Sequence, residues 1–344
     1  MSVHKAVCFG EIMLRLGAPG HERLLQSPRL EATFGGAEAN VAVSLAQFGW
    51  DSYYVTRLPA NPLGDAAVRA LRAEGVRVDH VVRGGARLGL YFTETGAGQR
   101  PSSVLYDRAG SAIAALEPGS IPWHDVLHGA AWFHASGITP ALGAGPAACT
   151  AEALDAARRA GARTSFDLNY RAKLWSPLEA GRVLQPLMSR VDLLVASLDQ
   201  LGPVLGIGVS NAELGGEGEE IEACRVGAER IARTFGIGLV ALTRRLSPSA
   251  SENAWSAVLF DATTGTLHES ARYVLRLVDR IGGGDAFTAG LVHGLATTGD
   301  AGRALRFAVA AGALKQTIPG DFNRVSADEV DHLVDGDGTY RVQR

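Results

Sequence analysis

Toward its C-terminal end the sequence places three glycines, Gly282, Gly283 and Gly284, directly before Asp285. A helix is predicted to follow, because apolar side chains recur at every fourth position: Phe287, Leu291 and Leu295. Glycines at a helix start leave backbone N–H groups unpaired at the positive end of the helix dipole, which favours phosphate or another anion. A carboxylate beside them can take a proton from an attacking hydroxyl while the N–H groups stabilise a transferring phosphoryl group. The alternative is a tight turn in which Asp285 only complements the dipole.

A second glycine-containing segment reads Phe34-Gly-Gly-Ala-Glu-Ala-Asn-Val-Ala-Val-Ser-Leu45. Its spacing predicts a loop that enters a helix, with Ala39, Val43 and Ala46 on the core face. The two segments lie about 240 residues apart, so a resemblance to one family at both is far more specific than a resemblance at either one alone.

Both segments resemble signatures of the ribokinase-like (PfkB) carbohydrate kinases. Gly282-Gly-Gly-Asp285 is similar to their Gly-Ala-Gly-Asp motif, with Gly283 in place of alanine, and the segment from Phe34 resembles their N-terminal sugar-binding motif Gly-Gly-x-x-x-Asn-x-Ala. The resemblance extends from residue 5 to about residue 334. It implies a kinase that uses ATP and Mg²⁺, with Asp285 as the catalytic base, and it places three residues of the N-terminal motif against the sugar: Gly35, Gly36 and Asn40.

Within this family the sequence most resembles the 2-keto-3-deoxygluconate kinases, through Tyr106-Asp-Arg108, Phe166-Asp-Leu-Asn-Tyr-Arg171 and Ile318-Pro-Gly-Asp-Phe-Asn323. A substrate carboxylate is matched by the rigid fork of an arginine guanidinium. The resemblance therefore implies phosphorylation of the terminal C6 hydroxyl of a sugar acid. The residues that it places in the sugar-acid pocket, besides the two glycines, are Tyr91, Tyr106, Arg108, Arg171 and Asp321. Their alternatives are surface ion pairs for the arginines, packing for the tyrosines and a turn residue for Asp321.

The resemblance also implies a nucleotide site, next to the polar segment Ala241–Ser251, which is expected to be a loop. The small-residue face of a helix predicted over Ala301–Lys315 could admit adenine, or it could serve close helix packing. The family's usual Asn-x-x-Glu, which organises Mg²⁺, is replaced by Ser197-Leu-Asp-Gln200, so no metal-ligating residue is assigned. The residues expected to contact ATP are Asn169, Ser197, Thr243, Arg244, Ser247, Gly282, Gly284 and Ala310.

These residues need a scaffold, and apolar strand-like runs alternate with helical patterns along most of the chain. Such alternation predicts an α/β fold with an open, doubly wound, mostly parallel sheet; a closed eight-stranded barrel is the competing architecture. The predicted strands are Lys5–Phe9, Ser52–Thr56, Ala131–Ala135, Arg163–Leu168, Val191–Ala196 and Gly238–Thr243. The predicted helices are Gly64–Glu74, Pro146–Ala160, Leu178–Ser189 and Ala223–Phe235.

Two regions depart from this alternation. Strand-like runs without an intervening helix, in 13–33 and 81–112, predict a small antiparallel flap, or lid, attached to one kinase domain over residues 1–334. An exposed flap could also pair with a second copy of the chain. Acidic, glycine-rich Glu213–Glu222 is expected to be a solvated loop, and Asp335–Arg344 a flexible tail.

Composition limits the remaining classes of function. The chain has 344 residues and a net charge of −3, which argues against a nucleic-acid or membrane-surface binder. No apolar run is long enough to cross a bilayer, and three scattered cysteines fit a reducing, cytoplasmic setting. His124 and His128 have helical metal spacing but no third ligand. A P-loop, a Gly-x-Ser-x-Gly elbow and a Gly-x-Gly-x-x-Gly fingerprint are absent.

Two alternatives to a sugar-acid kinase stay open. They are a kinase for a neutral sugar such as fructose or ribose, and a non-catalytic sugar- or nucleotide-binding module of the same fold.

Overall fold

A central sheet of nine strands runs through the computed structural model, which describes residues 3–209 and 217–336. Its order is β14 (Thr266–Glu269), β13 (Glu252–Asp261), β12 (Leu239–Leu246), β11 (Leu193–Ser197), β10 (Arg163–Asp167), β9 (Trp132–Ser136), β1 (Lys5–Phe9) and β4 (Asp51–Val55), with β15 (Tyr273–Arg276) also on β13. Neighbours from β12 to β4 are parallel, and β13, β14 and β15 extend the sheet antiparallel. The predicted open, mostly parallel sheet is confirmed.

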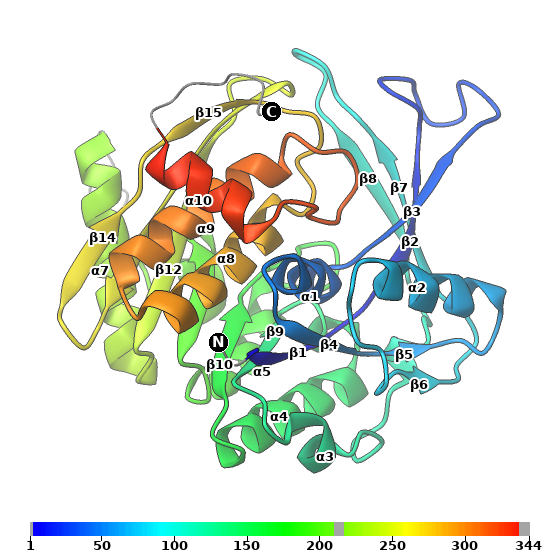
Figure 1. Cartoon of the computed structure of the whole chain (residues 1–344), viewed down its shortest axis with the longest axis horizontal. Helices are drawn as coiled ribbons and strands as arrows, with labels where there is room; N and C mark the ends of the chain where they lie inside the picture. Colours follow the sequence, from blue (N-terminus) through cyan, green and yellow to red (C-terminus); the bar gives the residue numbers. More distant parts are fainter. Residues whose placement is uncertain (1–2, 210–216, 337–344) are drawn as a thin grey trace.

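Helices cover both faces of this sheet (Figure 1). Successive side chains of a strand point to opposite faces, so Ala6 and Cys8 of β1 belong to one hydrophobic core, and Val7 and Phe9 to the other. The first core includes α1 (Ala37–Gln47), α2 (Pro62–Ala73), α8 (Gly283–Thr298), α9 (Ala301–Lys315) and α10 (Ala327–Asp335). The second includes α3 (Trp123–Leu127), α4 (Ala144–Arg159), α5 (Pro177–Met188), α6 (Leu198–Leu205) and α7 (Glu217–Phe235), and short 3₁₀ helices lie at Ile113–Ala115 and Pro140–Leu142.

A separate four-stranded sheet forms the lid, which projects from the body at the upper right of Figure 1. Its order is β3 (Glu31–Gly35), β2 (Met13–Gly17), β7 (Gly89–Glu94) and β8 (Ser103–Asp107). The prediction of an antiparallel flap was wrong in one respect, because β2 and β7 are parallel. A long crossover that contains α1, β4 and α2 joins them, and such a connection allows parallel pairing where a hairpin does not. The crossover also carries a two-stranded sheet, β5 (Arg57–Leu58) with β6 (Val82–Arg83).

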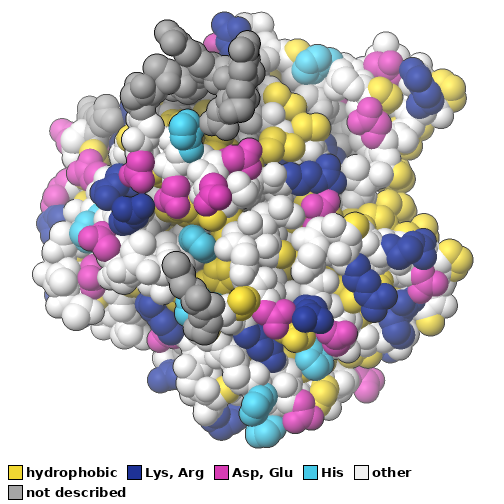
Figure 2. All heavy atoms as spheres, viewed as in Figure 1, with side chains coloured by type: hydrophobic (Ala, Val, Ile, Leu, Met, Phe, Trp, Pro, Cys, Tyr) yellow, Lys and Arg dark blue, Asp and Glu magenta, His cyan; other side chains and the backbone are white. Residues whose placement is uncertain are grey.

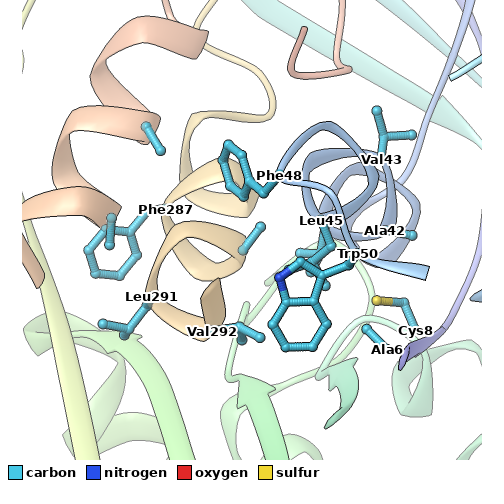
Figure 3. Close-up of a cluster of buried hydrophobic side chains, with 14 of the residues drawn as sticks. Ala6, Cys8, Ala42, Val43, Leu45, Phe48, Trp50, Phe287, Leu291 and Val292 are labelled. Atoms are coloured by element: carbon cyan, nitrogen blue, oxygen red, sulfur yellow. The ribbon is translucent and has the colours of Figure 1, made fainter. Parts of the chain in front are cut away.

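Helices α1 and α8 pack against each other over the central sheet (Figure 3). Leu45 of α1, Phe48 and Trp50 just after it, and Leu291 and Val292 of α8 belong to one cluster of side chains, and all five are buried. This packing brings together the first turns of two helices that are far apart in the sequence, at the carboxyl edge of the parallel strands. Ligands of open α/β sheets bind at that edge.

Two local predictions need correction. Arg244 and Arg245 were expected in a loop, but β12 continues through Leu246 because its antiparallel partner β13 extends the hydrogen-bond ladder. The acidic segment was expected to be a loop up to Glu222, but α7 begins at Glu217, and Arg225 supports it through ion pairs with Glu222 and Glu229. Residues 213–216 and 337–344 lie outside the described residues.

Acidic and basic side chains are interspersed on the face shown in Figure 2, as a near-neutral net charge implies. Across the described part of the chain, no helix is long and apolar enough to cross a membrane.

Candidate active site

A cleft of about 1140 Å³ opens at the carboxyl ends of the parallel strands, beneath the lid. The turn between β7 and β8 of the lid is joined to the body by two hydrogen bonds of Gly98. Its backbone N–H donates to Ser251 Oγ (3.0 Å), and its carbonyl accepts from Ala250 N–H (2.8 Å). Residues of both sheets line the cleft, among them Tyr91 of the lid and Asp167 of the central sheet. The predicted site residues that line it are Gly35, Gly36, Asn40, Tyr91, Tyr106, Arg108, Asn169, Arg171, Ser197, Thr243, Arg244, Gly282, Gly284, Asp285 and Asp321.

Asp285 lies in the first turn of α8, next to the glycine turn. Gly282 caps this helix with φ = 85°, a left-handed conformation that favours glycine. Asn40, in the first turn of α1, donates a hydrogen bond of 2.6 Å from Nδ2 to Asp285 Oδ2. Burial raises the pKa of Asp285 to about 7; the nearby Asp167 and Asp321 charges act in the same direction, and the Asn40 hydrogen bond and Arg171 oppose them. Asp285 is thus a carboxylate poised to exchange a proton near neutral pH.

Asp167 is a second carboxylate in the cleft, and the sequence analysis did not assign it a role. It ends β10, and its Oδ1 accepts a hydrogen bond of 3.0 Å from the backbone N–H of Asn169, which has φ = 40°. Burial raises the pKa of Asp167 to about 7, against the lowering effect of Arg171. The sequence could have indicated a role for Asp167, because it ends a predicted parallel strand and belongs to the segment Phe166–Arg171, and ligands bind at the carboxyl ends of such strands.

The lid side of the cleft is organised around Asp321. Tyr91 Oη donates to Asp321 Oδ2 (2.5 Å), and Arg15 Nη1 donates to Asp321 Oδ1 (2.8 Å) while also pairing with Asp279 (2.7 Å). Both oxygens of Asp321 are therefore engaged by protein groups, although the residue lines the cleft. A side chain at Gly35 would overlap this carboxylate, because a Cβ there would lie 2.0 Å from Asp321 Oδ2. Glycine is thus required at position 35 because the Asp321 carboxylate occupies the space that a side chain would need.

The two arginines expected to bind a carboxylate differ in their surroundings. Arg108 is buried, and its Nε and Nη2 both donate to Glu11 Oε2, the former at 2.8 Å. Among the described residues, Nη1 of Arg108 has no hydrogen-bond partner, so it is the part of the guanidinium left for a ligand. Arg171 is exposed in the cleft, with only a 3.5 Å contact to the Tyr170 carbonyl. Tyr91 and Tyr106 stack between the lid strands, with ring centroids 5.9 Å apart.

A group of arginines lies along the wall formed by β12 and the glycine turn. Arg171, Arg245 and Arg280 all line the cleft, and in the described ranges none of the three makes an ion pair with a carboxylate. Desolvation and the neighbouring charges of Arg280 and Arg171 lower the pKa of Arg245. Arg244 pairs instead with Glu220 of α7 (2.6 Å). Asp199 and Asp167 oppose the shift in the Arg245 pKa from beyond ion-pair distance, and three neighbouring arginines without a directly paired carboxylate are suited to a multiply charged anion.

The family model of the pfkB carbohydrate kinases matches residues 3–215 and 253–325, which include both glycine motifs and every strand of the parallel sheet except β12. The chain belongs to the pfkB family of carbohydrate kinases. Its fold is the ribokinase-like α/β fold of that family, with an open sheet and a small mixed lid sheet.

Individual relatives of this pfkB kinase agree with that assignment. A crystal structure of 2-dehydro-3-deoxygluconokinase from Thermotoga maritima superposes with a TM-score of 0.92 at 46% identity, over 97% of this chain and 99% of that one. A 2-dehydro-3-deoxygalactonokinase from Haloferax volcanii is 36% identical over 96% of each sequence. A structure of fructokinase with bound ATP from Xylella fastidiosa superposes with a TM-score of 0.77 at 25% identity, over 96% and 98% of the two chains.

Three residues expected to act in this kinase lie outside the cleft lining. Gly283 is buried against the Gln316 side chain, and Ala310 is fully buried in the core. Helix α9 contacts α8 through small residues, since a Cβ at Gly294 would lie 2.5 Å from Ala304 Cα; this favours packing over adenine binding as the role of its small-residue face. Ser247 is exposed and accepts a hydrogen bond of 3.0 Å from Arg280.

The pfkB kinase offers few protein ligands to a divalent cation. The described residues hold no cluster of three or more His, Cys, Asp or Glu side chains placed to bind a metal ion. Asp199 and Gln200 line the cleft, and Gln200 Oε1 is buried without a hydrogen-bond donor. Such a donor set fits Mg²⁺ that keeps most of its ligands as water and substrate phosphate.

Arg280 and Arg15 were not assigned roles from the sequence. Arg280 lies two residues before Gly282, so its closeness to the glycine motif could have indicated a place in the site. Arg15 lies in a strand of the lid and meets its partners only in the folded chain.

Proposed function

We propose that this pfkB kinase transfers the γ-phosphoryl group of ATP to the C6 hydroxyl of a 2-keto-3-deoxy sugar acid, with 2-keto-3-deoxygluconate as the first candidate. The observation that carries the proposal is the juxtaposition of Asp285 and the glycine turn with unpaired arginines in one lidded cleft. These groups supply a base, an anion site and counter-charges, which are the parts that phosphoryl transfer requires.

Asp285 acts as the base. Its carboxylate accepts the C6 hydroxyl proton as the hydroxyl oxygen forms its bond to the γ-phosphorus and the bond to the β,γ-bridging oxygen of ATP breaks. An alcohol is far less acidic than a carboxyl group with a pKa of about 7, so proton transfer accompanies phosphoryl transfer and does not precede it. The hydrogen bond from Asn40 to Oδ2 holds the carboxylate in place and leaves Oδ1 to accept the substrate proton.

The glycine turn and the arginines stabilise the charge that develops on the phosphates. Backbone N–H groups at the start of α8 point toward the transferring group, and Arg245 and Arg280 neutralise the triphosphate. Bound Mg²⁺, held near Asp199 and Gln200 mainly through water and phosphate, would supply further neutralisation of the phosphate oxygens. The relative from Xylella fastidiosa, whose structure contains ATP, supports ATP as the donor.

The carboxylate of the sugar acid is bound by Arg171 and by the remaining Nη1 of Arg108. The aromatic pair Tyr91 and Tyr106 forms an apolar wall of the same pocket, and the tethered lid excludes water that would otherwise accept the phosphoryl group. The relatives named for 2-dehydro-3-deoxygluconate and 2-dehydro-3-deoxygalactonate, the same chemical class, support a sugar acid and leave open which C4 epimer is preferred.

One observation favours a neutral sugar as the second candidate. Glu11 already neutralises Arg108, so only Arg171 remains as an unpaired cation for a substrate carboxylate. Fructokinases are also among the relatives of this chain.

A kinetic comparison of substrates tests the proposal. ADP release would be measured with 2-keto-3-deoxygluconate, 2-keto-3-deoxygalactonate, fructose and ribose at fixed ATP and Mg²⁺. We expect kcat/KM for an acid to exceed that for either neutral sugar by about 100-fold or more, and mass spectrometry to place the phosphate on C6. A preference for fructose or ribose would assign the second candidate, and binding without turnover of any substrate would assign a non-catalytic module.

A further inference from the structure

Lys315, at the end of α9, is a fully buried lysine that the mechanism above does not use. It is one of only three lysines in the chain, in which thirty other basic residues are arginines. Its Nζ donates hydrogen bonds to three backbone carbonyls: Gly320 (2.6 Å), Ile318 (3.2 Å) and Asp279 (3.4 Å). In the part of the chain that the structure describes, no carboxylate oxygen lies within ion-pair distance of this ammonium.

The three carbonyls satisfy all three protons of the ammonium. A buried charge is costly unless its hydrogen-bonding capacity is met, and a lysine ammonium has three donors and no acceptor. Burial lowers the pKa of Lys315, and the negative charges of Asp279, Asp321 and Asp285 oppose that shift. A planar, larger arginine head could not place donors on three converging carbonyls in the same way.

The carbonyls come from two segments that meet beneath the glycine turn. One segment runs from Asp279 to Gly282 and leads into α8; the other runs from 316 to 321 and carries Asp321. Gly320 N–H also donates to Asp279 Oδ2 (3.1 Å), and Asp279 N–H donates to the Gln316 carbonyl (3.2 Å), so further hydrogen bonds join the two segments. A Cβ at Gly282 would lie 3.0 Å from Lys315 Cε and 2.1 Å from the Asp321 carbonyl oxygen, so the lysine side chain passes directly under the turn.

We propose that Lys315 is a positioning residue of the phosphoryl-transfer site: its buried ammonium holds together the two segments that form the anion-binding turn and places a fixed positive charge beneath it. The inference rests on the proposed kinase function. Removing the charge leaves three carbonyl oxygens facing one another without a donor. The hydrogen bonds of Gln316 and Gly320 to the other segment remain, so we expect the segments to shift apart locally and the N–H groups of the turn to lose their alignment. Asp321 of the sugar pocket belongs to one of these segments, but Arg15 and Tyr91 of the lid also hold its carboxylate, so sugar binding is expected to change less than turnover.

The substitution Lys315→Met tests this inference, because methionine keeps an unbranched side chain and removes the ammonium. We expect kcat to fall by about 30-fold or more with KM for the sugar within about threefold, a pattern of lost transition-state stabilisation. Amide hydrogen exchange should accelerate in peptides that cover 279–285 and 316–322 and stay unchanged in the parallel strands. Lys5→Met is the matched control, since Lys5 donates to a single carbonyl, that of His128 (2.9 Å), far along the chain from the cleft segments.

A second variant, Lys315→Ala, removes the side chain and leaves space for a small amine. Addition of methylamine should restore turnover by about tenfold in Lys315→Ala but not in Lys315→Met, whose side chain fills the space. If Lys315→Met does not fold, the amine dependence of folding and activity in Lys315→Ala decides the question. Turnover of Lys315→Met within about twofold of the wild type, uniform acceleration of exchange, or indifference of Lys315→Ala to methylamine would each overturn the inference. The wild-type substrate panel tests the kinase function separately.

Discussion

Asn40 and Asp285 are joined by a hydrogen bond of 2.6 Å, although 245 positions separate them in the chain. Each lies in the first turn of its helix, and packing of α1 on α8 brings the two turns together. The N-terminal and C-terminal signatures of the family are therefore two halves of one site. The hydrogen bond also lowers the pKa of Asp285, the proposed base, which leads to the first two predictions.

Replacing Asp285 with asparagine removes the proposed base and keeps the shape of the side chain. We expect kcat to fall by about 10²–10⁴-fold with KM for the sugar nearly unchanged, because a general base acts in the transition state. Steady-state kinetics measures this. Asp155→Asn, on the outer helix α4, is the matched control and should behave like the wild type. Full turnover by Asp285→Asn would show that another group accepts the proton.

The pH profile of kcat/KM should show an acidic limb near pH 7. Burial raises the pKa of Asp285 to about 7, and only the deprotonated form can accept a proton, so activity is lost as the pH falls through that value. Asn40→Ala removes a hydrogen bond that lowers the pKa, so it should move the limb to higher pH. Asp167→Asn removes a negative charge that raises the pKa, so it should move the limb to lower pH. Shifts of equal sign in both variants would refute the assignment of the limb to Asp285.

Arg171→Ala should weaken binding of a sugar acid far more than of a neutral sugar. Loss of a charge-assisted hydrogen bond to the carboxylate is expected to raise KM for the acid by about 10- to 100-fold. Arg87→Ala, which breaks an exposed pair with Asp107 on the lid, is the control. An equal change in KM for acid and neutral sugars would mean that Arg171 binds the phosphates of ATP and not the sugar carboxylate.

Arg108→Ala should affect stability as well as binding. Glu11 would remain buried without its counter-charge, which typically costs about 3–5 kcal/mol. Urea unfolding should therefore show a lower free energy of unfolding for Arg108→Ala than for Arg171→Ala, whose side chain is exposed. Equal stabilities would mean that Glu11 finds another partner.

Two glycines of the turn should respond differently to alanine. Gly282→Ala places a Cβ on a left-handed residue, which costs about 1–2 kcal/mol, and within 2.1 Å of the Asp321 carbonyl oxygen, so the variant should be both less stable and inactive. Gly284→Ala meets no atom within 4 Å and lies inside a helix, so its stability should match the wild type within about 1 kcal/mol. Its methyl group faces the cleft, and the expected effect is lost turnover in a stably folded protein. Thermal unfolding and ADP release separate the two cases.

The sequence identified the parallel strands well, because each is an apolar run that carries its signal locally. It missed β13–β15 and the parallel pairing of β2 with β7, since strand pairing depends on contacts between distant segments. Arg244 and Arg245 were placed in a loop for the same reason: their strand exists because β13 lies beside it.

By itself, the sequence determined the alternation of strands and helices and the two glycine motifs, because hydrophobic period and glycine placement act over a few residues. Only the tertiary structure decided which charges remain available to a ligand. Glu11 forms an ion pair with Arg108, and Arg15 and Tyr91 donate hydrogen bonds to Asp321. Three backbone carbonyls accept hydrogen bonds from Lys315. Arg171, Arg245 and Arg280 line the cleft without a carboxylate partner among the described residues. The physical reason is that an ion pair depends on the distance between two side chains, and only folding sets that distance for residues far apart in the chain.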